Sequence, residues 1–378
     1  MPKRPRFGKT GKTVLAAIVV SLLLAVSIVK LRLPPYGFLK LWYLEYQSSK
    51  KLDIPAEYLH TDVAGLIALS TADDINRLRQ RLNRLIWGHD ELPTATAVPT
   101  VPALVDTRYD DIASLKQIDY LRVDMEFGLE SSIYHFIPTA SNNRLVLFHQ
   151  GHAGDFFHGK KQIRQFLDAG FAVAAFSMPL LGLNNQPTLH LPRLGRLRLT
   201  HHDQMKFLSP RRGHPVQYFI HPVIATLNYL ETAHGYDSVA MLGFSGGGWT
   251  TILCAALDPR IRKSFSVAGS YPIYLRSNAE RDWGDWEQTV PELYRTANYL
   301  ELYVLGAAGQ ARKQLQVINK YDPCCFAGEK WRTYRASVAN QVETIGDGEF
   351  DLLLDDTHAE HTISDFALRR IMEELNAL

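Results

Sequence analysis

The order of hydrophobic and polar residues divides the chain into three stretches. Residues 13–29 form a run without a charged side chain. Residues 73–87 carry apolar side chains at helical spacing, which predicts an amphipathic helix. The apolar positions of this helix are Ile75, Leu78, Leu82, Leu85 and Ile86. Beyond about residue 118, short apolar runs alternate with helical stretches, a pattern typical of a parallel sheet that is covered on both faces.

The third stretch predicts an α/β domain. Strands are expected at 120–127, 132–139, 144–150, 171–178, 238–244, 263–269, 300–306 and 350–356. Helices are expected at 160–168, 216–232, 249–257 and 364–377. The first two strands flank Gly128 and predict a hairpin. An irregular insertion, 180–214, precedes the helix at 216–232 and is a candidate lid.

The first apolar run predicts a membrane-spanning helix at 13–30. Five basic residues precede it and Lys30 closes it. As a helix the run spans roughly 26 Å, close to the thickness of a bilayer core. The basic residues predict a cytoplasmic tail at 1–12, a retained signal anchor, and a chain whose remainder lies on the non-cytoplasmic side. The alternative is a signal peptide cleaved near Ala25-Val26-Ser27, which would release a secreted protein.

Length and composition limit the number of domains and the kinds of molecule that the protein binds. The chain has 378 residues, of which 46% are hydrophobic and 21% are charged, with a formal net charge of +2. This length allows one catalytic-sized domain, expected at 118–378, after a helical and irregular extension at 31–117. A net charge this small argues against nucleic acid as a partner. Nothing in the sequence indicates the oligomeric state.

One glycine-rich stretch requires a special explanation. Gly243-Phe244-Ser245-Gly246-Gly247 lies where an expected strand gives way to an expected helix, although glycine weakens both. A sharp strand-to-helix turn needs such small residues. It would project the Ser245 hydroxyl above the carboxyl edge of the sheet and would place the backbone N–H of Gly246 at a helix N-terminus.

These five residues resemble the nucleophile elbow of the α/β-hydrolase superfamily, which includes serine esterases and peptidases. The order of strands and helices from about Ile118 onward is similar to that fold. The resemblance implies an α/β-hydrolase fold with a mostly parallel central sheet and helices on both faces. It also implies a catalytic triad in the chain order serine, acid, histidine.

The resemblance places the histidine after the last strand. "HTIS" is similar to the superfamily's final motif, which favours His361, and His358 is the alternative. The acid usually follows the next-to-last strand, but no carboxylate stands in "VLGAAGQARKQ". The next one downstream, Asp322, is the preferred acid, and Asp285 is the alternative.

The loop after residues 144–150 is expected to complete the oxyanion hole. Its "GHAGDF" is similar to the family's His-Gly loop, which assigns the second donor to the backbone N–H of His152, beside that of Gly246. Gln150 is the alternative. The nearby histidines, His149, His152 and His158, have no clustered acidic or cysteine partner in the sequence. No metal or organic cofactor is therefore expected.

The sequence thus predicts a membrane-anchored serine hydrolase. The preferred activity is that of a carboxylesterase, which cleaves a small-molecule ester or acyl substrate through an acyl-enzyme. A serine peptidase is one alternative. The other is a non-catalytic binding protein with the same fold, which the carboxylate missing from "VLGAAG" would favour.

Overall fold

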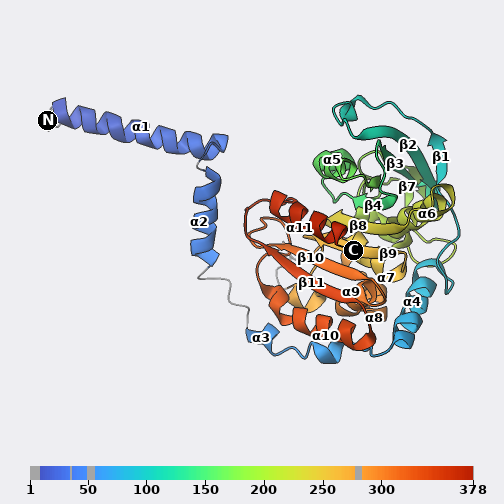
Figure 1. Ribbon diagram of the computed structural model, residues 1–378. Coiled ribbons are helices and arrows are strands. Elements are labelled where there is room, and N and C mark those ends of the chain that lie inside the picture. Colours follow the sequence, from blue (N-terminus) through green and yellow to red (C-terminus); the bar gives the residue numbers. More distant parts are fainter. Residues whose placement is uncertain (1–8, 35, 49–55, 277–282, 378) are drawn as a thin grey trace.

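The computed structural model describes residues 9–34, 36–48, 56–276 and 283–377 (Figure 1). Residues 1–8 of the expected cytoplasmic tail lie outside this part of the chain. The helices are α1 (Lys9–Leu31), α2 (Tyr36–Ser48), α3 (Ala56–Leu59), α4 (Ala72–Trp87), α5 (Lys160–Asp168), α6 (Gln217–Ala233), α7 (Gly246–Leu257), α8 (Pro291–Thr296), α9 (Tyr299–Ala307), α10 (Arg335–Ile345) and α11 (Asp365–Asn376).

Within the described residues, nine strands form one sheet in the order β1-β2-β3-β5-β4-β8-β9-β10-β11. They are β1 (Val98–Val101), β2 (Leu115–Asp124), β3 (Glu130–Pro138), β4 (Arg144–His149), β5 (Ala172–Phe176), β8 (Ser238–Phe244), β9 (Ile261–Val267), β10 (Lys313–Asn319) and β11 (Glu349–Asp355). All neighbours from β5 to β11 are parallel, whereas β1, β2, β3 and β5 pair antiparallel. The mostly parallel sheet is as expected. So is the hairpin around Gly128, which β2 and β3 form.

Helices cover both faces of the sheet (Figure 1). Apolar side chains of α4, α6, α7, α8, α9 and α10 share one core. Those of α5 and α11 share the core on the other face. Along β8, Met241 belongs to the first core, while Ala240 and Leu242 belong to the second. This alternation follows from the two-residue period of a strand and buries both faces of the sheet.

The order of the strands marks the edge of the sheet where ligands bind in folds of this kind. The chain passes from β4 to β5 on one side, and β8 then pairs with β4 on the other side. In open α/β sheets, ligands bind outside the carboxyl ends of the strands where the strand order reverses in this way. The segments that follow His149 in β4 and Phe244 in β8 both begin at this point.

The expectation of a strand at 300–306 is wrong, because these residues form helix α9. Asn298 and Glu301 make a capping box that begins the helix, and every residue of α9 is buried. A short apolar run that is buried on all sides does not distinguish a strand from a helix. The next-to-last strand is instead β10. Its residues combine polar and apolar side chains, and no strand was expected there.

The N-terminal part contains further elements. Among the described residues, Thr13–Leu31 is long and apolar enough to cross a membrane or to act as a signal sequence, and no residue of its most apolar part is buried. Helix α4 begins with a capping box between Thr71 and Asp74 and covers the range expected for it. Strand β1 comes from the extension and extends the sheet. The insertion at 180–214 folds into a hairpin, β6 (Thr188–Leu191) and β7 (Gly195–Arg198), followed by the short helix η5 (His202–Phe207).

Candidate active site

Ser245 stands on a strained turn between β8 and α7. Its backbone has φ 55° and ψ −123°, a conformation that residues other than glycine rarely adopt. A Cβ added at Gly243 would lie 2.0 Å from the carbonyl oxygen of Gly247, so this position requires glycine. Ser245 is partly exposed, and its hydroxyl makes no hydrogen bond to any residue that the structure describes. The turn therefore presents an accessible hydroxyl at the end of β8.

The loop after β4 lies directly against this turn. A Cβ added at Gly151 would be 2.6 Å from the Cβ of Ser245 and 3.2 Å from the backbone nitrogen of Gly246. His152 follows in the same loop. The N–H of Gln150, the alternative donor, instead donates to the Phe176 carbonyl at 2.9 Å. The N–H of Gly246 opens helix α7, where it has no acceptor within the helix.

His361 and Asp322 form a hydrogen-bonded pair beside the turn. The distance between Nδ1 of His361 and Oδ2 of Asp322 is 2.7 Å. The Asp322 side chain is fully buried, whereas 21% of the His361 side chain is exposed. The His361 ring packs on Phe244, the residue before Ser245, with ring centroids 4.6 Å apart. The pair therefore resembles the base and orienting acid of a triad.

The segment after β10 holds Asp322 in place. Backbone N–H groups of Cys324 and Cys325, which form a disulfide with each other, donate to Oδ1 at 2.8 and 3.2 Å. The side-chain amide of Asn319 donates to Oδ2 at 3.2 Å. Because β10 ends at Asn319, Asp322 stands three positions after the next-to-last strand. A carboxylate therefore does follow the next-to-last strand, and its apparent absence came from taking α9 for a strand.

The alternative residues have other neighbours. Nε2 of His358 lies 3.3 Å from Oδ2 of Asp355, at the end of β11. Oδ2 of Asp285 lies 3.0 Å from Nε2 of His152. The structure thus brings Asp322 to His361, and it brings Asp285 to the loop that follows β4.

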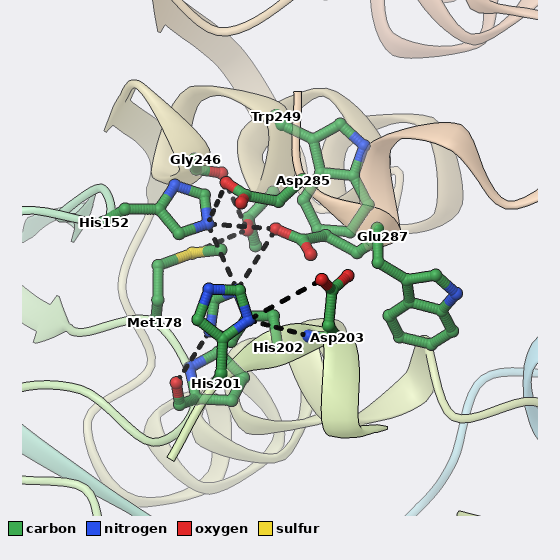
Figure 2. Close-up of polar contacts among 12 residues, drawn as sticks. His152, Met178, His201, His202, Asp203, Gly246, Trp249, Asp285 and Glu287 are labelled. Carbon is green, nitrogen blue, oxygen red and sulfur yellow. Dashed lines mark hydrogen bonds and ion pairs between the residues drawn. The ribbon is translucent and has the colours of Figure 1, made fainter. Parts of the chain in front are cut away.

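A group of polar side chains that no sequence pattern indicated lies next to the elbow and is formed by His152, His202, Asp285 and Glu287 (Figure 2). We call it the polar cluster. Nε2 of His152 lies 3.0 Å from Oε1 of Glu287 and 3.2 Å from Nδ1 of His202. His202 and Glu287 are 50 and 135 residues away from His152 along the chain, so no local spacing could have indicated them.

The charges of the polar cluster depend on one another. Burial by itself would raise the pKa of Glu287, but contacts with His152 and His202 outweigh burial and lower the pKa to about 2. Burial likewise opposes a charge on His202, but Glu287 raises its pKa above the usual value. Glu287 is therefore a carboxylate although its side chain is completely buried.

Solved structures provide the comparison with known proteins. No profile of a known protein family matches the sequence, and no curated protein does. Acetyl xylan esterase 1 from Thermoanaerobacterium sp. JW/SL YS485 is similar over 86% of this chain and 100% of its own, with a TM-score of 0.52 and 15% identity. Acetyl xylan esterase from Paenibacillus sp. R4 covers 83% of this chain and 98% of its own, with a TM-score of 0.52 and 15% identity.

A third structure, methylesterase BT1017, is similar over 82% of this chain and 64% of its own, with a TM-score of 0.54 and 15% identity. At such identities the likeness concerns the fold. Together with the order of the strands and the turn at Ser245, it confirms the fold that the sequence predicted. The chain has the fold of the α/β-hydrolase superfamily.

Proposed function

We propose that this protein is a serine hydrolase of the carboxylesterase type. Ser245 attacks the ester carbonyl, and His361 takes the proton of the hydroxyl and returns it to the leaving group. Asp322 orients the imidazole and stabilises its charged form. Water then hydrolyses the acyl-enzyme by the same steps.

The hydrogen bond between His361 and Asp322 carries this proposal. Because Nδ1 lies 2.7 Å from a buried carboxylate oxygen, Nδ1 holds a proton and donates it. The lone pair of the neutral ring is then on Nε2, the nitrogen that must accept the serine proton. The strained backbone of Ser245 supports the same assignment, since strain of this kind is characteristic of nucleophile elbows.

The backbone N–H groups of Gly246 and His152 are proposed to stabilise the tetrahedral oxyanion. The close approach of Gly151 to Ser245 supports this, because it puts the loop of His152 beside the nucleophile. Removing one such donor typically costs about 3–4 kcal/mol of transition-state stabilisation. An ester is the proposed substrate class, in line with the names of the similar structures.

We further propose that α1 anchors the protein in a membrane. In this arrangement residues 1–12 are cytoplasmic, 13–30 span the bilayer, and the extension 31–117 and the hydrolase domain 118–378 lie on the other side. The exposed apolar surface of Thr13–Leu31 supports it. A detergent-extracted protein with an intact N-terminus is expected. A mature chain that begins near Ile28 would instead indicate a secreted protein.

A fluorophosphonate probe tests the catalytic proposal, because it labels only activated serines. The full chain in detergent should be labelled, and Ser245→Ala should not. Absence of labelling in the folded wild type would favour a non-catalytic binding protein. Hydrolysis of p-nitrophenyl esters but not of peptide p-nitroanilides is expected, and the reverse preference would indicate a peptidase.

A further inference from the structure

The polar cluster has the spacing of a metal site. Nε2 of His152, Nδ1 of His202 and Oε1 of Glu287 all lie within 4.8 Å of one another. The separations are 3.2 Å between the two nitrogens, 3.0 Å from Nε2 of His152 to Oε1 of Glu287, and 3.3 Å from Nδ1 of His202 to the same oxygen. Ligands at about 2.0–2.1 Å from a tetrahedral Zn²⁺ lie about 3.3 Å apart. The three atoms could therefore bind one ion with little movement.

The hydrogen bond on the other side of His202 directs its lone pair into the cluster. Nε2 of His202 lies 2.9 Å from the carbonyl oxygen of Pro179, which can only accept, so Nε2 carries a proton. In the neutral ring, Nδ1 carries a lone pair that faces Nε2 of His152 at 3.2 Å and Oε1 of Glu287 at 3.3 Å. This lone pair and the carboxylate oxygen need a positive charge beside them, which either a proton on Nδ1 or a bound cation can supply. A carbonyl that holds the second imidazole nitrogen is also the usual support of a metal-binding histidine.

Nε2 of His152 has more polar neighbours than one ring proton can bond to. Its Nε2 lies 3.0 Å from Glu287, 3.0 Å from Asp285 and 3.2 Å from His202, whereas one ring N–H donates fully to one acceptor. Glu287 is completely buried, and its other oxygen, Oε2, has no hydrogen-bond partner among the described residues. A buried carboxylate with an unpartnered oxygen requires compensation by charge.

From this geometry we propose that the polar cluster binds a zinc-class divalent ion. His152, His202 and Glu287 are the ligands, a set of two imidazoles and one carboxylate that suits Zn²⁺. A water molecule would fill the fourth position of a tetrahedral site. The carboxylate of Asp285 lies nearby, 3.0 Å from Nε2 of His152. This differs from the sequence-based expectation of no metal, because the partners of His152 come from distant segments.

The ion would join three parts of the chain next to the nucleophile. His152 belongs to the loop after β4, His202 begins η5 in the insertion, and Glu287 lies in η7 (Trp286–Thr289). The His152 ring packs against the elbow, since a Cβ added at Gly246 would be 2.4 Å from its Cε1. A bound ion would hold the His152 loop against Ser245. This consequence for catalysis rests on the proposed function, whereas metal binding itself does not.

Metal titration of the full chain in detergent tests the proposal. The purified protein is stripped with a chelator and titrated with ZnCl₂ or CoCl₂. The wild type should bind one equivalent, with the intense visible absorption of four-coordinate Co²⁺ and a higher Tm after Zn²⁺ is added. Glu287→Gln and His202→Asn should each weaken binding by about 100-fold or more, since each removes a ligand.

His201→Asn is the matched control, because His201 is the exposed neighbour of His202 and lies outside the cluster. It should bind Zn²⁺ like the wild type. Sub-stoichiometric binding by the wild type without the Co²⁺ absorption, or unchanged binding by Glu287→Gln, would overturn the proposal. The wild-type titration needs no variant, so a variant that fails to fold does not prevent the test. Metal binding without fluorophosphonate labelling would refute the proposed function and leave this inference intact.

Discussion

Replacing Asp322 by asparagine should change the protonation of His361 without removing its neighbours. In the wild type, Oδ1 accepts the two backbone bonds from Cys324 and Cys325, and Oδ2 accepts from His361 and Asn319. Asparagine has one oxygen and one NH₂ group. If the oxygen keeps the two backbone bonds, the NH₂ group faces Nδ1 of His361, which must then accept a proton rather than donate one.

The magnitude follows from this change of tautomer. With Nδ1 accepting, the proton of the neutral ring moves to Nε2, so the nitrogen that should take the Ser245 proton has no lone pair. The corresponding substitution in a serine protease triad lowers kcat about 10⁴-fold, which is about 5 kcal/mol of transition-state stabilisation. We expect a loss of that size in Asp322→Asn, with little change in KM, because Asp322 does not contact the substrate.

The assay is steady-state hydrolysis of a p-nitrophenyl ester, with the folded fraction verified by near-UV circular dichroism. Asp356→Asn is the matched control, because Asp356 is an exposed carboxylate directly after β11. Its kcat should equal that of the wild type. A loss of less than about tenfold in Asp322→Asn would refute the reasoning, because a displaced tautomer has to cost more than 1.4 kcal/mol.

Three further predictions concern the site loop, a buried carboxylate and a helix cap. Gly151→Ala should abolish fluorophosphonate labelling, because the new Cβ would lie 2.6 Å from the Cβ of Ser245, and normal labelling would contradict this contact. Burial opposes the charge of Asp355, but its side-chain hydrogen bonds outweigh burial and lower the pKa from 3.8 to about 2. The stabilisation is therefore present above the unfolded pKa and is lost as the pH falls through about 2. In urea unfolding, the difference in free energy between wild type and Asp355→Asn should shrink by about 2 kcal/mol from neutral pH to pH about 2, and a constant difference would argue against it. Thr71→Ala removes the N-cap of α4 and should lower the free energy of unfolding by about 1 kcal/mol, and an unchanged value would show that the cap adds nothing.

Local patterns were enough to predict much of the fold. The run at 238–257 predicted a strand, a sharp turn at Ser245 and a helix, because the need for glycine at such a turn can be read from neighbouring residues. Helix α5 lies at the residues that its spacing predicted, and α4 begins one residue earlier than expected. The same holds for the apolar run at 13–29, whose length and lack of charge are properties of the segment itself.

Two assignments depended on the tertiary structure. Residues 300–306 form a helix that is buried on every side, and the periodicity of a short, mostly apolar run does not distinguish a buried helix from a buried strand. The true strand, β10, is built by pairing with β9 and β11, which lie far away in the sequence. Only this pairing shows that Asp322 follows the next-to-last strand.

The sequence by itself determined the α/β class and the sharp turn at Ser245, because each rests on a local pattern, and it reduced the candidate base to His361 or His358 and the candidate acid to Asp322 or Asp285. The tertiary structure decided which histidine meets which carboxylate and assembled the polar cluster. Those contacts join segments up to 135 residues apart. Their distances are set by how the loops at the carboxyl edge of the sheet pack on one another, and this packing depends on the whole chain rather than on any local pattern.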